Sequence, residues 1–198
     1  AGALAIRLGE GLHRLYKDLD DNAPFSPSAD QAGRRALKIA ALQLLTRRDG
    51  GKLAASAFAR ARSMTEEIGA LAALLDVHQG EKELTAFVAR WGRDANVMDK
   101  WYALQIATAE PAEAAALTAR LLGNPGFDWK NPNRFRSVIG ALAANHAGFH
   151  HRSGAGYRLV ADWLLKLDPL NPQTASRVST AFETWPRYDA ARRKLAKA

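Results

Sequence analysis

Apolar residues recur at helical spacing along most of the chain. From Leu4 to Leu19, leucines follow one another at intervals of three to four residues and predict one amphipathic helix. That helix is expected to end where Asp20-Asp21-Asn22-Ala23-Pro24 breaks the pattern. No stretch of the sequence shows the β-rich alternation of a strand pair, so we predict an all-α fold.

Helix starts and stops divide the remainder of the chain. Asp30 is expected to cap a helix that Asp49-Gly50-Gly51 ends. Ser63 and Glu66 have capping-box spacing at the start of another helix, which Gln79-Gly80 closes. The other helices are expected at residues 52–62, 81–93, 97–108, 111–123, 131–143, 155–167, 171–185 and 188–198, with a broken region at 145–151.

These roughly ten helices are short and are joined by short turns. Consecutive short helices in antiparallel pairs favour a superhelical stack of the HEAT or armadillo kind over a four-helix bundle. The length and the hydrophobic content of 47% allow one compact domain over residues 1–198.

A near-repeat supports the stack. Residues 131–137 read Asn-Pro-Asn-Arg-Phe-Arg-Ser, and residues 171–177 read Asn-Pro-Gln-Thr-Ala-Ser-Arg, 40 residues later. In each, asparagine is a good N-cap and proline is tolerated in the first turn. We therefore expect two equivalent helix starts on one side of the stack. Helix N-termini with arginines nearby suit a peptide carboxylate, but on this feature alone we favour ordinary caps with solvated arginines.

Charge and composition narrow the function classes. The chain carries a formal net charge of +8, which allows nucleic acid or an acidic protein surface as a partner. Its basic residues are scattered among alanines and leucines, which is typical of solvated helix faces. The absence of cysteine removes disulfides and thiol nucleophiles and is compatible with a reducing compartment. No apolar run approaches the roughly 20 residues of a membrane span, so the chain is expected to be soluble.

Catalytic motifs are missing from the sequence. No histidine is followed by glutamate, so the His-Glu-x-x-His helix of a zinc peptidase is not present, and no phosphate-binding loop is recognisable. His146 and His150 have the only metal-like spacing, but Gly148 weakens a helix between them and no carboxylate stands at a useful offset. We expect His150 and His151 to be partly exposed loop residues, and we expect no catalytic residue and no metal ligand in this chain.

Several motifs in the same order resemble the C-terminal helical domain of bacterial aminopeptidase N, a family of zinc metallo-aminopeptidases. The resemblance spans nearly the whole chain. The motifs are residues 32–37, 63–66, 97–101, 131–137, 153–157, 171–177 and 187–189. At 63–66 the chain has Ser-Met-Thr-Glu where the family tends to have Asn-Met-Thr-Asp, a difference that concerns capping.

The resemblance implies a function that this chain does not perform alone. It implies a larger enzyme whose catalytic domain, with its zinc, lies N-terminal to this segment, and a helical domain that closes over a chamber admitting peptides. By the same resemblance, Gln173 lines the pocket for the N-terminal side chain of the substrate, Arg177 reaches the peptide further along, and Arg136 lies near the chamber. Zinc would be bound outside this chain, the partners would be peptide substrate and the enzyme's own catalytic domains, and the location would be cytoplasmic.

Two alternatives stay open. A free-standing HEAT-like scaffold could bind a protein or nucleic acid through its basic helix faces, and this binding would weaken steeply with salt. A small hydrolase using His146 and His150 would carry stoichiometric zinc, which we do not expect.

Overall fold

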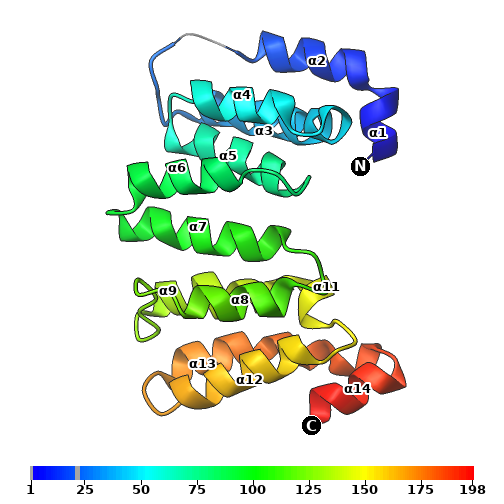
Figure 1. Ribbon diagram of the computed structural model, residues 1–198, viewed down its shortest axis with the longest axis vertical. Coiled ribbons are helices and arrows are strands. Elements are labelled where there is room, and N and C mark those ends of the chain that lie inside the picture. The colour runs from blue at the N-terminus through cyan, green and yellow to red at the C-terminus, as the bar shows by residue number, and fades with distance from the viewer. Residues whose placement is uncertain (1, 21–22) are drawn as a thin grey trace. The chain divides into compact units, whose positions relative to one another are not determined.

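The computed structural model describes residues 2–20 and 23–198, and every regular element in them is helical. The prediction of an all-α fold is confirmed for this part of the chain (Figure 1). The chain divides into two compact units, Ala1–Arg93 and Asp94–Ala198. None of the described helices is both long enough and apolar enough to cross a membrane.

The first unit is organised around its longest helix, α3. It consists of α1 (Gly2–Arg7), α2 (Gly9–Asp18), α3 (Ala29–Asp49), α4 (Lys52–Arg60), α5 (Met64–Leu75) and α6 (Glu81–Trp91). Helix α3 packs against α1, α2, α4 and α5. The core of the first unit includes the side chains of Leu42, Leu45, Leu71, Leu74 and Phe87, each no more than 3% exposed.

The first predicted helix is wrong in one respect. The helix is interrupted at Leu8, which separates α1 from α2. Leu4 and Leu8 are about half exposed, although their spacing placed them on the apolar face. Leu12 is buried as expected. Leucine periodicity therefore identified the helical character but could not show that the chain turns after the first few residues.

Caps explain most of the other boundaries in this unit. The start of α3 is capped by Ser28, whose Oγ accepts from the Gln31 amide, and Asp30 lies inside the helix, so the expectation for Asp30 was wrong. Gly50 ends α3 at φ 65°, as its sequence predicted. Ser63 caps α5 through the Glu66 amide, while the Glu66 carboxylate accepts from the Arg62 amide.

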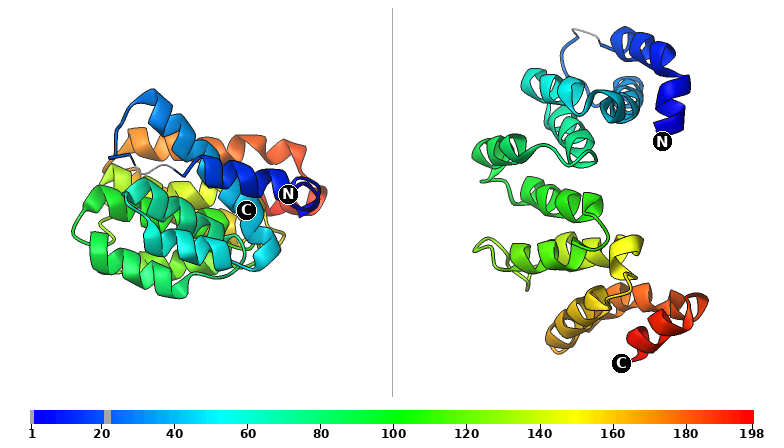
Figure 2. Two further views of the ribbon diagram at one scale, coloured as in Figure 1. Left: turned by 90° about the horizontal axis from the view of Figure 1, so that it is seen from above. Right: turned by 45° about the vertical axis from the view of Figure 1, so that its right-hand side comes forward.

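The second unit is built from α7 (Ala95–Thr108), α8 (Ala114–Leu122), α9 (Pro132–Phe135), η1 (Arg136–Gly140), α10 (Ala141–Ala144), α11 (His146–Phe149), α12 (Ala155–Leu167), α13 (Pro172–Ser179), η2 (Thr180–Arg187) and α14 (Ala190–Lys197). Within it, α12 packs against α8 and α13, and α7 packs against η1 and α10. Figures 1 and 2 show α12 and α13 side by side in yellow and orange.

The core of this unit is aromatic and branched aliphatic. Seven large side chains in it are at most 1% exposed: Tyr102, Ile106, Phe135, Ile139, Leu142, Phe149 and Leu167. Two of the expected helices change type along their length. The helix opened by Asn131 passes through the π-helical turn η1, and the helix opened by Asn171 becomes the 3-10 segment η2, which contains Pro186.

Candidate functional site

The two Asn-Pro starts are built alike and lie on the same side of the second unit, at the left in Figure 1. Asn131 Oδ1 accepts from the amides of Asn133 (2.9 Å) and Arg134 (3.3 Å). Asn171 Oδ1 accepts from the Thr174 amide at 3.0 Å. The prediction of two equivalent, asparagine-capped helix starts is therefore confirmed.

The loop before α9 is held by aromatic packing. Phe127 is buried, and its ring meets the ring of Trp163 from α12 edge to face at 5.5 Å between centroids. Trp129 also meets Trp163, at 6.1 Å, and Lys166 lies over both tryptophan rings. These contacts fix the loop against α12 and so fix the direction in which α9 begins.

Arg134 is the most heavily engaged side chain of this region. Its Nε donates to Asp99 Oδ1 in an ion pair, Nη1 donates to the Gly126 carbonyl at 2.5 Å and Nη2 to the Ala95 carbonyl at 3.1 Å. The guanidinium also lies 4.9 Å from the centre of the Tyr102 ring, whose phenol has a pKa raised by burial. Arg134 thereby ties α9 to α7 and to the preceding loop.

Sequence reasoning did not find this pair. Asp99 and Arg134 both stand inside motifs that were singled out, but no helical or turn spacing joins two residues 35 positions apart. The only sequence signal was the presence of two arginines in the motif at 131–137. In the structure Arg134 is buried and Arg136 is exposed.

Arg136 stands at the start of the π-helical turn. Its Nη2 donates to Asn133 Oδ1 at 2.6 Å, and its side chain faces solvent. The π turn inserts one extra residue per turn into the helix, which rotates the positions that follow. Such turns occur frequently at functional sites.

Gln173 and Arg177 lie four residues apart on α13 and are both exposed. The opposite face of α13 is buried through Thr174, Ala175 and Val178. Positions separated by four residues share a helix face, so the structure brings Gln173 and Arg177 together. Among the described residues, no ion pair neutralises Arg177. Arg136 belongs to a different element, and no interaction joins it to these two in the described part of the chain.

The structure contradicts the expectation that His150 is partly exposed. His150 is only 4% exposed, its Nδ1 lies 2.8 Å from the Tyr157 hydroxyl, and its ring stacks on Tyr188 at 4.0 Å. Burial, with smaller contributions from His146 and Arg192, lowers the pKa of His150 to about 4. It was wrong to expect a partly exposed loop residue here, because α11 and the C-terminal segment enclose the ring.

The pair His146 and His150 does not have the surroundings of a metal site. The two rings are parallel with centroids 6.3 Å apart, and one His150 nitrogen is occupied by Tyr157. In residues 2–20 and 23–198, no group of three or more His, Asp or Glu side chains could hold a metal ion.

The family model described as a domain of unknown function with ARM repeats, DUF3458_C, matches residues 1–198. This chain belongs to that family. ARM repeats are stacked short helices, so the DUF3458_C description agrees with the predicted armadillo-like fold.

Three curated relatives of this DUF3458_C chain are named aminopeptidase N. The chain is 37% identical over 191 residues to aminopeptidase N of Caulobacter vibrioides, which covers 93% of this chain and 22% of the relative. It is 31% identical over 201 residues to aminopeptidase N of Escherichia coli, which covers 98% of this chain and 23% of the relative. The chain thus spans about a fifth of the length of these relatives. The resemblance to the helical domain of bacterial aminopeptidase N is confirmed.

A solved structure of an aminopeptidase is also similar to this chain. The chain is similar to Legionella pneumophila aminopeptidase A in complex with aspartic acid, with a TM-score of 0.87 and 27% identity. The match covers 98% of this chain and 24% of the solved one.

Proposed function

We propose that this chain is the helical domain of a zinc-dependent aminopeptidase that releases N-terminal amino acids from peptides. The observation that carries the proposal is the similarity to aminopeptidases, which extends over nearly the whole chain. Zinc, which would polarise the scissile carbonyl and activate water, belongs to a part of the enzyme outside this chain. The cytoplasmic location is part of the same proposal.

In this function the domain closes the active-site chamber and positions the peptide. Gln173 and Arg177 are suited to positioning because both are exposed on one face of α13, whose start is fixed by Asn171 and Pro172. The Arg177 guanidinium binds a peptide carboxylate or carbonyl, and the Gln173 amide contacts the N-terminal residue of the substrate. Arg136 adds positive charge from the first Asn-Pro segment, residues 131–137. These groups orient the substrate and take no part in bond cleavage.

The role of Arg177 is tested in the complete enzyme with the Arg177→Ala variant and two substrates. One is tri-alanine, which has a free carboxylate, and the other is alanine p-nitroanilide, which has none. A lost charge-assisted hydrogen bond costs about 1.5–3 kcal/mol, so we expect the KM for tri-alanine to rise roughly tenfold or more. The KM for the anilide should change much less.

Arg193→Ala is the matched control, because Arg193 is an exposed arginine of α14 with no place in the proposed site. It should leave both KM values unchanged. Equal rises for both substrates in Arg177→Ala would exclude carboxylate recognition by Arg177 and leave the similarity to aminopeptidases as it stands.

A further inference from the structure

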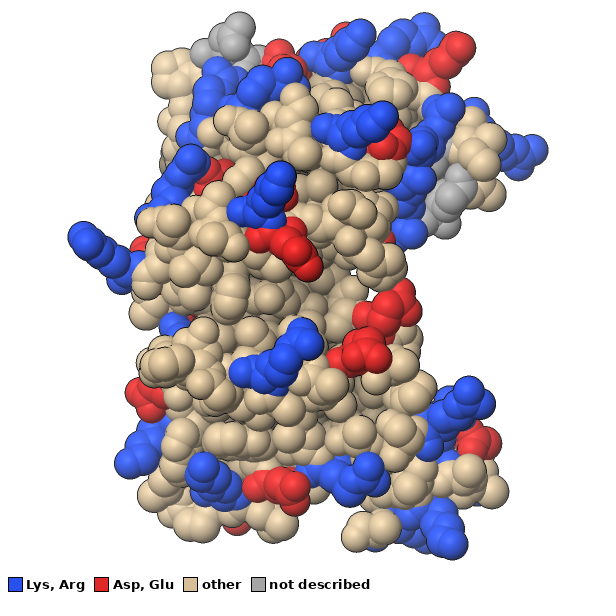
Figure 3. Space-filling model, in the orientation of Figure 1, with Lys and Arg blue, Asp and Glu red and all other residues tan. Residues whose placement is uncertain are grey.

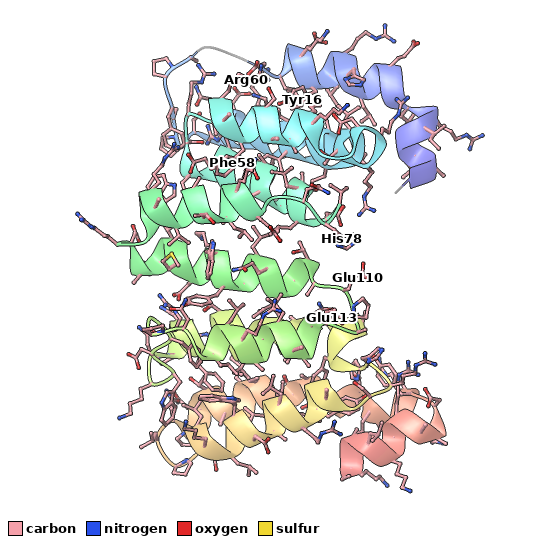
Figure 4. All side chains as sticks on the ribbon, in the orientation of Figure 1. Tyr16, Phe58, Arg60, His78, Glu110 and Glu113 are labelled. Atoms are coloured by element: carbon pink, nitrogen blue, oxygen red, sulfur yellow. The ribbon has the colours of Figure 1, made fainter. Side chains whose placement is uncertain are left out.

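The first unit contains a cavity of about 250 Å³ between α2, α3 and α4 and the turn that follows α4. Tyr16 reaches it from α2, Arg35 and Lys38 from α3, and Arg60 from the end of α4. Figure 4 shows Tyr16 and Arg60 near one another between α2 and α4. None of Gln173, Arg177 and Arg136 belongs to it, so the cavity is separate from the residues proposed to position the peptide.

The charge of this lining is unbalanced. It contains four cationic side chains, with Arg62 as the fourth, against two carboxylates, Asp20 and Glu66. Lys38 serves both carboxylates, at 2.6 Å from Asp20 and 3.8 Å from Glu66. One lysine cannot neutralise two carboxylates, so four positive against two negative charges leave this lining with a net charge of +2. Figure 3 shows Lys and Arg side chains gathered over this part of the first unit.

Donor capacity remains in two of these arginines. Arg60 forms no ion pair within the described residues. Arg35 uses Nη1 for Gln31 (3.1 Å) and Nη2 for the Ser26 carbonyl (3.0 Å), while its Nε is buried without a hydrogen-bond partner. The Arg35 Nε has almost no accessible surface, so the donors available to a ligand are those of Arg60 and the remaining N–H groups of Arg35 Nη1 and Nη2.

The remaining wall is apolar. This wall of the cavity is formed by Ile39, Leu42, Ala57, Ala61 and the ring of Tyr16. Burial raises the pKa of the Tyr16 phenol although Lys38 and Arg60 act in the opposite direction, which indicates that the hydroxyl is withdrawn from water while cations lie close to it.

We propose that this cavity binds a small organic anion, a carboxylate or a phosphate monoester that carries one aromatic ring or a short aliphatic chain. The arginines receive the anionic group, as guanidinium groups do for both carboxylate and phosphate. The side chains of α3 and α4 receive the apolar group. The volume admits one ring with its anionic substituent, since an apolar cavity of about 150 Å³ accommodates benzene.

The probe for the test is 4-azidobenzoate, an aromatic carboxylate that attaches covalently to its surroundings on illumination. It is applied to the complete polypeptide that carries this chain, followed by proteolysis and mass spectrometry. We expect labels on peptides from α2, from residues 39–47 of α3 and from α4, and we expect excess benzoate to protect them. 4-Azidophenyl phosphate is the second arm, and the stronger of the two labels identifies the preferred anionic group. The neutral 4-azidobenzyl alcohol should label the same peptides at least about fivefold less.

Three variants separate binding in this cavity from general attraction of anions to a basic surface. Arg60→Gln should reduce labelling at least about fivefold, whereas Lys52→Gln, which removes an exposed charge from the same helix, should not. Ala57→Leu fills the apolar side without changing any charge and should also abolish labelling. Circular dichroism establishes that each variant is folded. Labels scattered over other helices, or labelling of Arg60→Gln and Ala57→Leu at the level of the parent chain, would overturn the proposal.

Discussion

At the scale of single residues, Arg134 shows how one side chain holds several elements. Its guanidinium serves the Asp99 carboxylate and two backbone carbonyls while only 10% of the side chain is exposed. A buried charge is tolerated only when its donors are matched in this way, because desolvation is costly. The same matching makes the pair sensitive to loss of either partner.

We therefore expect Arg134→Met to lower the free energy of unfolding by about 2–4 kcal/mol, since it leaves the Asp99 carboxylate and two carbonyls without their donor. The measurement is denaturant unfolding followed by circular dichroism. Arg136→Met, at an exposed arginine two positions away, should change the free energy by less than about 0.5 kcal/mol. Removing Asp99 as well, in Arg134→Met with Asp99→Leu, should recover part of the loss, and a further large loss would contradict the pairing.

His150 gives the chain a predictable response to acid. Its pKa is lowered to about 4 in the folded chain by burial, against 6.5 for an ordinary histidine, so the unfolded chain binds a proton more readily between these values. Stability contributed by neutral His150 is present above about pH 6.5 and is lost as the pH falls towards 4. The shift corresponds to a loss of up to about 3 kcal/mol.

The prediction is checked by denaturant unfolding at pH 7.5, 6 and 5. His150→Gln should flatten this part of the pH profile, because it removes the titrating group and keeps a polar side chain opposite Tyr157. His151→Gln, at the adjacent and more exposed histidine, should keep the profile of the parent chain. An unchanged profile in His150→Gln would exclude His150 as the source.

At the scale of elements, the asparagine caps set the positions of the helices that carry the proposed substrate contacts. Asn171→Ala should lower the free energy of unfolding by about 1 kcal/mol, because the Thr174 amide loses its acceptor. In the complete enzyme the KM for tri-alanine should rise as well, since α13 carries both Gln173 and Arg177. Asn171→Ser, which keeps a capping oxygen, should restore both quantities. A normal KM in a destabilised Asn171→Ala variant would mean that the cap does not position these two residues.

Local signals predicted elements better than they predicted their interruptions. The caps at Ser63, Asn131 and Asn171 and the stop at Gly50 could be inferred from residue type, because each acts within three or four positions. The break at Leu8 and the passage from α13 into η2 could not, because packing against other helices decides them.

The buried long-range contacts of the second unit could not be predicted from sequence patterns. Asp99 and Arg134 meet across 35 residues, and Arg192 Nε donates to the His150 carbonyl across 42. Periodicity and turn chemistry describe neighbours along the chain, whereas these contacts depend on which helices pack together. The resemblance to a known family identified the exposed candidates and gave no indication of the buried pairs.

At the scale of the whole molecule, the net charge of +8 is the property that the scaffold hypothesis would use. A nucleic-acid-binding domain concentrates its basic residues on one face, and its affinity then falls steeply with salt as counterions are released. A peptide site with one or two arginines depends on salt far less. The two functions therefore differ in how binding responds to ionic strength.

We expect the chain to bind a 20-base-pair DNA duplex weakly at 50 mM salt and to lose this binding by 200 mM, as non-specific electrostatic contacts do. The KM of the complete enzyme for tri-alanine should change by less than about threefold over the same range, because a single charge-assisted contact in a partly enclosed site is screened little. Fluorescence anisotropy of the labelled duplex and initial-rate kinetics supply the two measurements. Duplex binding that stays tighter than about 1 μM at 200 mM salt would favour the scaffold, because incidental basic residues cannot sustain such affinity once counterion release is suppressed.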